Sequence, residues 1–239
     1  MLDFDSRREL FIGKDAEEAI TFAADHWMHL ARQAIQERGR FAVALSGGST
    51  PKAIYQKLSV RKDLDWTKVF LFWSDERAVS PDHPDSNYHM AIEFFKHHPI
   101  PAHQIFRMKA ETDIDHNAKD YEDKIRHYLG KRLFDLVMLG VGEDGHTASL
   151  FPETAALTIE DRLVVANFIP EKNSHRMTFT FRCINESRNI AIYALGSSKQ
   201  EIVPKVLHAP IISHYPSSRI GTETAKALWI LDSASAQDL

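Results

Sequence analysis

Short apolar runs alternate along this chain with longer stretches in which apolar residues recur every three or four positions. A run of four to six apolar residues is typical of a strand that is buried on both faces of a sheet. The runs that predict strands are 41–45, 69–73, 136–141, 163–166, 177–181, 190–195 and 227–231. In 177–181 apolar and polar residues alternate, which predicts a strand with one exposed face or a place at a sheet edge.

The periodic stretches predict amphipathic helices. One long helix covers 15–37 and ends near Gly39, and another covers 113–129 with Gly130 near its end. Strands that alternate with helices predict an α/β protein. No internal repeat, low-complexity tract or Gly/Ser linker divides the chain, so we expect residues 1–239 to form one domain.

The stretch 136–152 carries the most informative pattern. Its apolar run ends in three glycines, at positions 140, 142 and 145, which enclose Glu143, Asp144 and His146. Titratable groups therefore follow the carboxyl end of a strand, where open α/β sheets bind ligands. In an extended segment Asp144 and His146 point the same way, so the carboxylate is able to orient the imidazole for acid–base chemistry.

Three interpretations of this stretch compete. The glycine spacing matches the dinucleotide-binding fingerprint, but that motif opens a helix whose amino end faces a pyrophosphate. Here Glu143 and Asp144 would present negative charge to the phosphates, and Pro152 comes too soon for a long helix. We therefore reject the dinucleotide interpretation. Two interpretations remain, a plain glycine turn with a solvated histidine and a catalytic acid–histidine loop.

A second motif, Ser46-Gly47-Gly48-Ser49-Thr50-Pro51-Lys52, follows the strand 41–45 directly. Pro51 suits the first turn of a helix, with Ser49 or Thr50 as its cap. A helix that begins there points free N–H groups and a positive dipole end at the sheet edge, which suits a phosphomonoester or a carboxylate. The motif lacks the spacing and the terminal Lys-Ser/Thr of a nucleoside triphosphate loop. The alternative is a plain strand-to-helix turn.

Polar residues also follow two other strands. Asp75, Glu76 and Arg77 come after 69–73, and Arg77 suits an anion or a polarised carbonyl. The alternative for these three residues is a surface salt bridge. Lys199 follows 190–195 and is either a second phosphate contact or an exposed lysine at the start of a short helix.

Composition excludes several classes of partner. The net charge of −4 gives no general attraction to nucleic acid or to an anionic membrane, and no apolar stretch approaches the length of a membrane span. Cys183 is the only cysteine and is expected to be a small core residue, so the sequence predicts no disulfide and fits a reducing compartment. Together with the charged segment Met1–Glu9, this predicts a cytoplasmic protein.

The histidines at 83, 89, 97 and 98 do not recur at a metal-binding spacing beside other ligands, and we expect no metal site and no cofactor. We interpret these histidines as solvated or capping groups. Ser86 or Asp85 is expected to cap a helix whose inner face includes Ala91, Phe94 and Phe95.

Taken together, these motifs resemble the 6-phosphogluconolactonases. The segments that carry the resemblance are 44–52, 75–77 with 83–87, 140–152, 176–180, 196–199 and 229–232. They occur in the family's order over nearly the whole chain. The resemblance implies a doubly wound α/β fold, a mostly parallel sheet with helices on both faces, and hydrolysis of 6-phospho-D-glucono-1,5-lactone to 6-phosphogluconate in the oxidative pentose phosphate pathway.

The resemblance also implies roles for individual residues. His146 would act as general base and acid, with Asp144 orienting it. Lys199 and the turn formed by Gly47, Gly48, Ser49 and Thr50 would hold the phosphate. Arg77 would contact either the phosphate or the developing oxyanion. Asp75 and Asn87 are further site candidates, followed by Arg176 and Arg182. The expected partner is a small phosphorylated sugar lactone, and the chain is expected to be a monomer or a weak homo-oligomer.

Two alternatives remain. Glucosamine-6-phosphate deaminases share the fold, but they usually read Asp-Glu-Tyr and Gly-His-Ile-Gly-Phe-Asn-Glu-Pro. This chain has Arg77 in place of the tyrosine, and its residues 147–152 lack the glutamate that ring-opening chemistry uses. A non-catalytic sugar-phosphate sensor is the other alternative, but no helix-turn-helix segment is visible.

Overall fold

The computed structural model describes residues 1–130 and 133–239 and contains a seven-stranded main sheet. Its strand order is β1-β2-β10-β9-β6-β3-β4, and every neighbouring pair is parallel except β1 with β2. The strands are β1 (Leu2–Asp3), β2 (Arg8–Gly13), β3 (Phe41–Leu45), β4 (Val69–Trp73), β6 (Leu136–Gly140), β9 (Ile190–Ala194) and β10 (Ala227–Asp232). The mostly parallel sheet expected from the sequence is confirmed.

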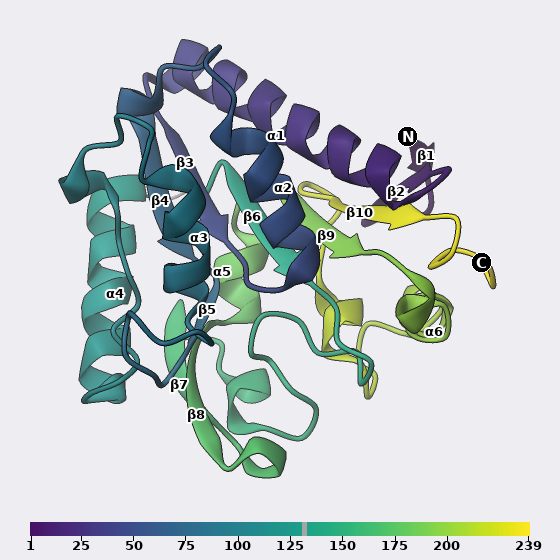
Figure 1. Ribbon diagram of the computed structural model, residues 1–239. Coiled ribbons are helices and arrows are strands. Elements are labelled where there is room, and N and C mark those ends of the chain that lie inside the picture. The colour runs from purple at the N-terminus through teal and green to yellow at the C-terminus, as the bar shows by residue number, and fades with distance from the viewer. Residues whose placement is uncertain (131–132) are drawn as a thin grey trace.

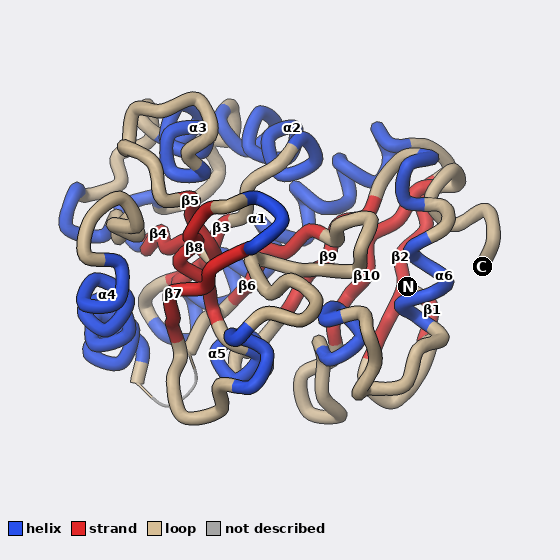
Figure 2. Tube along the Cα trace, turned by 90° about the horizontal axis from the view of Figure 1, so that it is seen from below, coloured by secondary structure: helices blue, strands red, loops and turns tan. Residues whose placement is uncertain are grey.

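Helices lie on both faces of this sheet. They are α1 (Ala16–Arg38), α2 (Ser49–Ser59), α3 (Asn87–Phe95), α4 (Ile114–Leu129), α5 (Phe181–Asn185) and α6 (Ile202–Leu207). In the two views α1, α2 and α3 pack together on one face, and α5 lies on the opposite one (Figure 1, Figure 2). Strands between these layers are therefore covered on both faces, which explains why β3 and β4 consist entirely of apolar residues.

The fold contains a second, antiparallel sheet that the sequence pattern did not predict. Its order is β5-β8-β7, with β5 (Asp75–Arg77), β7 (Val164–Ile169) and β8 (Ser174–Phe179). Figure 1 shows it beyond the carboxyl ends of the main strands, on the β4 side. The chain leaves the main sheet at Ser74, whose carbonyl accepts from Phe179 N, and continues at once into β5. Residues 75–77 are thereby fixed in a strand instead of a loop.

The prediction for β8 was wrong in two respects. β8 is the central strand of the small sheet, not an edge, and Met177, Thr178 and Phe179 are all buried. The strand ends at Phe179 because the side chain of Thr180 accepts from Cys183 N and caps α5. The alternation in 177–181 therefore reflects a strand followed by a helix cap.

The predicted cap of α2 also needs correction. The capping position is Gly48, Ser49 is the first helical residue, and no side chain caps the helix. Pro51 does lie in the first turn, as expected. By contrast, Ser86 caps α3 by accepting from His89 N, which confirms one of the two predicted caps.

The strand order places a crevice at the carboxyl edge. From β3 the chain passes to β4 on one side, whereas β6 lies on the other side of β3 and is followed outward by β9 and β10. Such a reversal opens a crevice between the two strands, here β3 and β6, and ligands bind at this point in α/β folds. Among the helices of the described residues, none is long and apolar enough to cross a membrane.

Candidate active site

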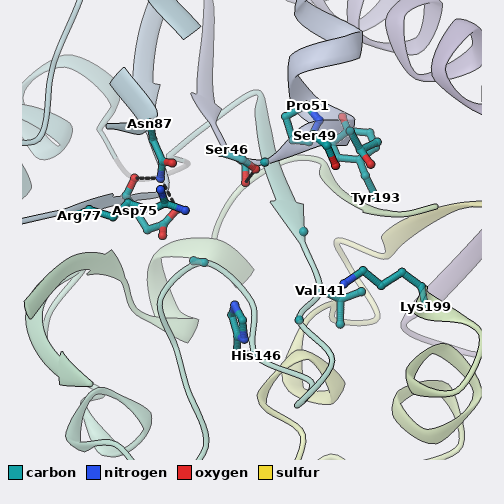
Figure 3. A pocket seen from close by; sticks show the side chains of 16 residues that line it. Ser46, Ser49, Pro51, Asp75, Arg77, Asn87, Val141, His146, Tyr193 and Lys199 are labelled. Carbon is teal, nitrogen blue, oxygen red and sulfur yellow. Dashed lines mark hydrogen bonds between the residues drawn. The ribbon is translucent and has the colours of Figure 1, made fainter. Parts of the chain in front are cut away.

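A cavity of about 290 Å³ lies at this crevice, and the ends of four strands contribute to its wall. The lining residues are Ser46, Gly47, Gly48, Ser49, Thr50, Pro51, Asp75, Arg77, Asn87, Gly140, Val141, Gly142, His146, Ala148, Tyr193 and Lys199 (Figure 3). The candidates named from the sequence are in this set, except Asp144, which is hydrogen-bonded to His146, and the weaker candidates Arg176 and Arg182. The structure thus brings together groups that are more than 150 residues apart in the chain.

The turn between β3 and α2 forms one side of the cavity. Gly48 has a φ of 106°, a conformation that residues with a side chain rarely adopt. A Cβ on Gly47 would lie 1.9 Å from Oδ1 of Asn87, so this position also needs glycine. The Tyr55 hydroxyl accepts from Ser46 N and donates to Ser46 O, which anchors the start of the turn.

The amino end of α2 faces the cavity without a side-chain cap. The first N–H groups of a helix have no partner within the helix, and the helix dipole places partial positive charge there. The hydroxyl groups of Ser49 and Thr50 lie beside these N–H groups. This end of α2 is therefore suited to hold an anion.

Glu76 is buried beside the cavity and fixes the position of its neighbours. Its carboxylate accepts from the N–H groups of Arg77, Asn87 and Tyr88, each at 2.8 Å, and from the Ser86 hydroxyl at 2.9 Å. Burial raises the pKa of Glu76, although the four hydrogen bonds act in the opposite direction. Glu76 joins β5 to the start of α3 and is not a group that faces substrate.

Asp75 is held by two donors. Asn87 Nδ2 donates to its backbone oxygen at 2.9 Å and to Oδ1 at 3.2 Å, and Ser149 Oγ donates to Oδ2 at 2.7 Å (Figure 3 shows the Asn87 bonds). The role of Ser149 was not predicted from the sequence. Ser149 lies 74 positions after Asp75 in the chain, so no local pattern indicates that the two side chains meet.

Arg77 extends along the cavity wall and donates to the backbone oxygen of Asp85 at 2.6 Å. Arg176 pairs with it in register across β5 and β8. Burial and the neighbouring charge of Arg77 lower the pKa of Arg176. Arg176 is not among the lining residues, and Arg182 forms an ion pair with Glu186 on α5, away from the cavity. The structure therefore does not bring Arg182 to the site.

His146 and Asp144 form a hydrogen-bonded pair, with Nδ1 of the imidazole 2.5 Å from Oδ1 of the carboxylate. The same oxygen accepts from His146 N at 3.1 Å. An extended segment was expected here, but the chain turns. Gly142 N donates to the His146 oxygen, Gly145 N donates to the Gly142 oxygen, and Gly145 has a φ of 78°. The two side chains meet because the chain turns.

The Asp144 carboxylate determines which nitrogen of the neutral imidazole carries the proton. Partial burial by itself would raise the pKa of Asp144, but the hydrogen bond and the charge of His146 outweigh it, and the pKa is lowered. An ionised carboxylate keeps the proton of a neutral imidazole on Nδ1 and leaves a lone pair on Nε2. His146 lines the cavity, so this arrangement offers a proton acceptor to a molecule bound there.

Phe151 stacks on the His146 ring, with ring centroids 3.9 Å apart and an angle of 19° between the planes. Gly142 also lies close to the imidazole, because a Cβ added there would be 2.1 Å from Nδ1. The ring is thus in contact with the phenyl ring of Phe151 and close to the bare backbone of Gly142. The sequence pattern gave no role to Phe151.

Lys199 and Tyr193 complete the wall from β9 and the 3-10 helix Ser197–Lys199 that follows it. Lys199 takes part in none of the ion pairs found in residues 1–130 and 133–239. Tyr193 was not predicted, because it sits in a run of apolar residues that reads as core. Within the same part of the chain, no group of three or more His, Cys, Asp or Glu side chains is placed to hold a metal ion.

Known proteins match the chain over almost its whole length. The protein family described as glucosamine-6-phosphate isomerases/6-phosphogluconolactonase matches residues 14–229. A 6-phosphogluconolactonase of Chlamydia muridarum is 40% identical over 235 residues, which cover 98% of this chain and 91% of that protein. The structure of 6-phosphogluconolactonase from Trypanosoma cruzi superposes with a TM-score of 0.87 at 25% identity, covering 98% of each chain.

A monomeric glucosamine-6-phosphate deaminase has a similar structure. It superposes with a TM-score of 0.83, covering 97% of this chain and 100% of the deaminase chain, at 20% identity. At this level of identity the likeness concerns the fold.

Proposed function

This chain belongs to the family of glucosamine-6-phosphate isomerases and 6-phosphogluconolactonases, and we propose that it hydrolyses 6-phospho-D-glucono-1,5-lactone to 6-phosphogluconate in the oxidative pentose phosphate pathway. The observation that carries the proposal is the His146–Asp144 pair at one side of a cavity whose other side is an anion-binding helix end. A phosphorylated ester bound there has its acyl carbon within the reach of an oriented base.

We assign the phosphate of the substrate to the amino end of α2 and to Lys199. The turn 47–50 offers N–H groups and hydroxyls, and Lys199 offers a positive charge from the 3-10 helix that follows β9. A charged donor and a helix end together suit a phosphate dianion. Held at this end, the sugar extends across the cavity towards His146.

In the proposed reaction, Nε2 of His146 takes a proton from water as the water oxygen attacks the lactone carbonyl. The carbonyl oxygen becomes an oxyanion, and we assign to Arg77, which lines the cavity, either its stabilisation or a contact with the phosphate. The ring C–O bond then breaks, and the imidazolium returns the proton to the leaving ring oxygen. Asp144 stabilises the imidazolium through the bond to Nδ1.

The side chains of the site favour attack by water over a covalent intermediate. Ser149 is buried, donates its hydroxyl proton to Asp75 and is not among the residues that line the cavity. Cys183 is buried in the core, and burial raises the pKa of its thiol. A buried, unpaired thiol also fits the cytoplasmic location that we propose.

The alternative, deamination of glucosamine 6-phosphate, is less well supported. Where the deaminase motif Gly-His-Ile-Gly-Phe-Asn-Glu-Pro has its glutamate, this chain has Phe151, whose ring packs on His146. A phenyl ring is unable to exchange the protons that ring opening requires. The Phe151 stack instead orients the imidazole.

Turnover of three substrates by the wild-type protein tests the proposal. We expect 6-phospho-glucono-1,5-lactone, generated in situ, to be consumed well above its spontaneous rate. Glucono-1,5-lactone, which lacks the phosphate, should react with a much higher KM, and glucosamine 6-phosphate should release no ammonia. Ammonia release without lactone turnover would contradict the proposal.

A further inference from the structure

Tyr193 has a buried hydroxyl group for which the fold supplies no partner. The side chain is 3% exposed, and its Oη makes no hydrogen bond within residues 1–130 and 133–239. Burying a hydroxyl without a partner costs free energy, and a phenylalanine would fill the same space without that cost. Packing alone therefore does not explain why residue 193 is a tyrosine and not a phenylalanine.

The hydroxyl groups of two other buried tyrosines, Tyr55 and Tyr121, have hydrogen-bond partners within the fold. The Tyr55 hydroxyl bonds to the N–H and to the carbonyl of Ser46. The Tyr121 hydroxyl accepts from Trp73 N and donates to Phe106 O. Tyr193 is the exception.

The position of Tyr193 connects its hydroxyl with the anion-binding side of the cavity. The residue lies on β9, against which α2 packs, and it lines the cavity together with the turn 46–51. Figure 3 shows it next to Ser49 and Pro51, on the wall that also carries Lys199. Its phenol is close enough to that of Tyr55, the anchor of Ser46, to affect the ionisation of Tyr55.

We propose that Tyr193 is a phosphate-binding residue whose hydroxyl donates a hydrogen bond to a phosphate oxygen at the amino end of α2. This inference rests on the proposed function for the identity of the phosphorylated substrate. In the free protein the hydroxyl is covered, so the contact requires a small shift of the turn. The exposed Ser49 side chain and the two glycines before it allow such a shift.

The ionisation of the phenol fits this role. Burial raises the pKa of Tyr193, so the hydroxyl keeps its proton throughout the pH range of an enzyme assay. A neutral phenol donates to a phosphate dianion without adding a charge, and a donor to an ionised acceptor makes a stronger bond than one between two neutral groups.

Tyr193→Phe removes the hydroxyl and keeps the ring. Isothermal titration calorimetry with inorganic phosphate and with 6-phosphogluconate should give a Kd about tenfold higher than that of the wild type. KM for 6-phospho-glucono-1,5-lactone should rise by about the same factor, with kcat changed less than about twofold. The melting temperature should not fall, because the free protein loses no hydrogen bond.

Tyr121→Phe is the matched control. Its hydroxyl has two partners, and neither Tyr121 nor these partners line the cavity, so this variant should melt at a lower temperature and bind phosphate as the wild type does. An unchanged Kd for phosphate in Tyr193→Phe would overturn the inference, and so would a lowered melting temperature. If wild type lacks lactone turnover but Tyr193→Phe still weakens phosphate binding, the inference stands and the proposed function fails.

Discussion

Gly142→Ala is the substitution that most directly perturbs the geometry of the His146–Asp144 pair. The added Cβ would lie 2.1 Å from Nδ1 and 2.2 Å from Cε1 of His146, and 2.6 Å from Oδ1 of Asp144. An ordinary van der Waals contact begins at 3.4 Å, so the imidazole has to move by more than about 1 Å. The backbone itself tolerates alanine, because Gly142 is not among the glycines with positive φ.

This displacement should cost far more activity than stability. A misplacement of about 1 Å in a catalytic group costs roughly 100-fold in rate, and loss of the 2.5 Å bond to Asp144 adds to it. We expect kcat/KM for the phosphorylated lactone to fall about 100- to 1000-fold, or about 3–4 kcal/mol of transition-state stabilisation. The two side chains are partly exposed and are able to rotate outward, so the melting temperature should fall by only a few degrees, about 1 kcal/mol.

A double-mutant cycle with His146→Ala separates this cause from a general distortion. If Gly142→Ala acts through the imidazole, adding it to His146→Ala should leave the residual rate unchanged. If Gly142→Ala alone has a kcat/KM within about threefold of the wild-type value, the steric argument is refuted. A further loss in the His146→Ala background would show that Gly142 acts on another part of the site.

Three further predictions concern residues around the site. Burial alone would raise the pKa of Glu122, but hydrogen bonds from Arg126 and Arg162 lower it. Because a hydrogen bond to a charged group contributes about 2 kcal/mol, Glu122→Gln should lose about this much in urea unfolding at pH 7. The stabilisation is complete above the unfolded pKa of about 4, so the difference should disappear as the pH falls from there through the folded pKa. Glu76→Gln places an amide N–H₂ against backbone donors, so we expect a loss of about 1–3 kcal/mol, measured by urea unfolding, and a lower kcat/KM. Lys199→Met should raise KM for the phosphorylated lactone at least about tenfold with a smaller effect on kcat, and steady-state kinetics with glucono-1,5-lactone, which should be unaffected, serves as its control.

The strands of the main sheet were the most predictable part of the fold. The apolar runs at 41–45 and 69–73 coincide with β3 and β4, because strands covered on both faces leave no polar position in the pattern. β2 was not predicted, since Leu10, Phe11 and Ile12 form a run of only three apolar residues after the charged Arg8 and Glu9. The small sheet was missed because β5 has three residues and pairs with β8 about 100 positions later, for which a local pattern carries no signal.

The site was predictable where polar residues end an apolar strand, and not elsewhere. This rule found the turn at 47–50, Arg77, His146 and Lys199, all of which line the cavity. Tyr193 was not assigned a role because an aromatic residue in an apolar run is typical of the core, and Phe151 was not because its position in a loop gives no signal. What distinguishes them, an unpartnered hydroxyl and a stack on the imidazole, exists only in three dimensions.

The consumption of 6-phospho-glucono-1,5-lactone by wild type and His146→Ala, each corrected for spontaneous hydrolysis, tests the central claim most directly. We predict a fast wild type and a variant slower by about 10²–10⁴-fold, since we assign the acid–base role to His146. We also predict that the variant still binds 6-phosphogluconate, because the proposed phosphate contacts, Lys199 and the turn 47–50, do not include His146. A wild type no faster than the blank, or a variant as fast as the wild type, would contradict the account.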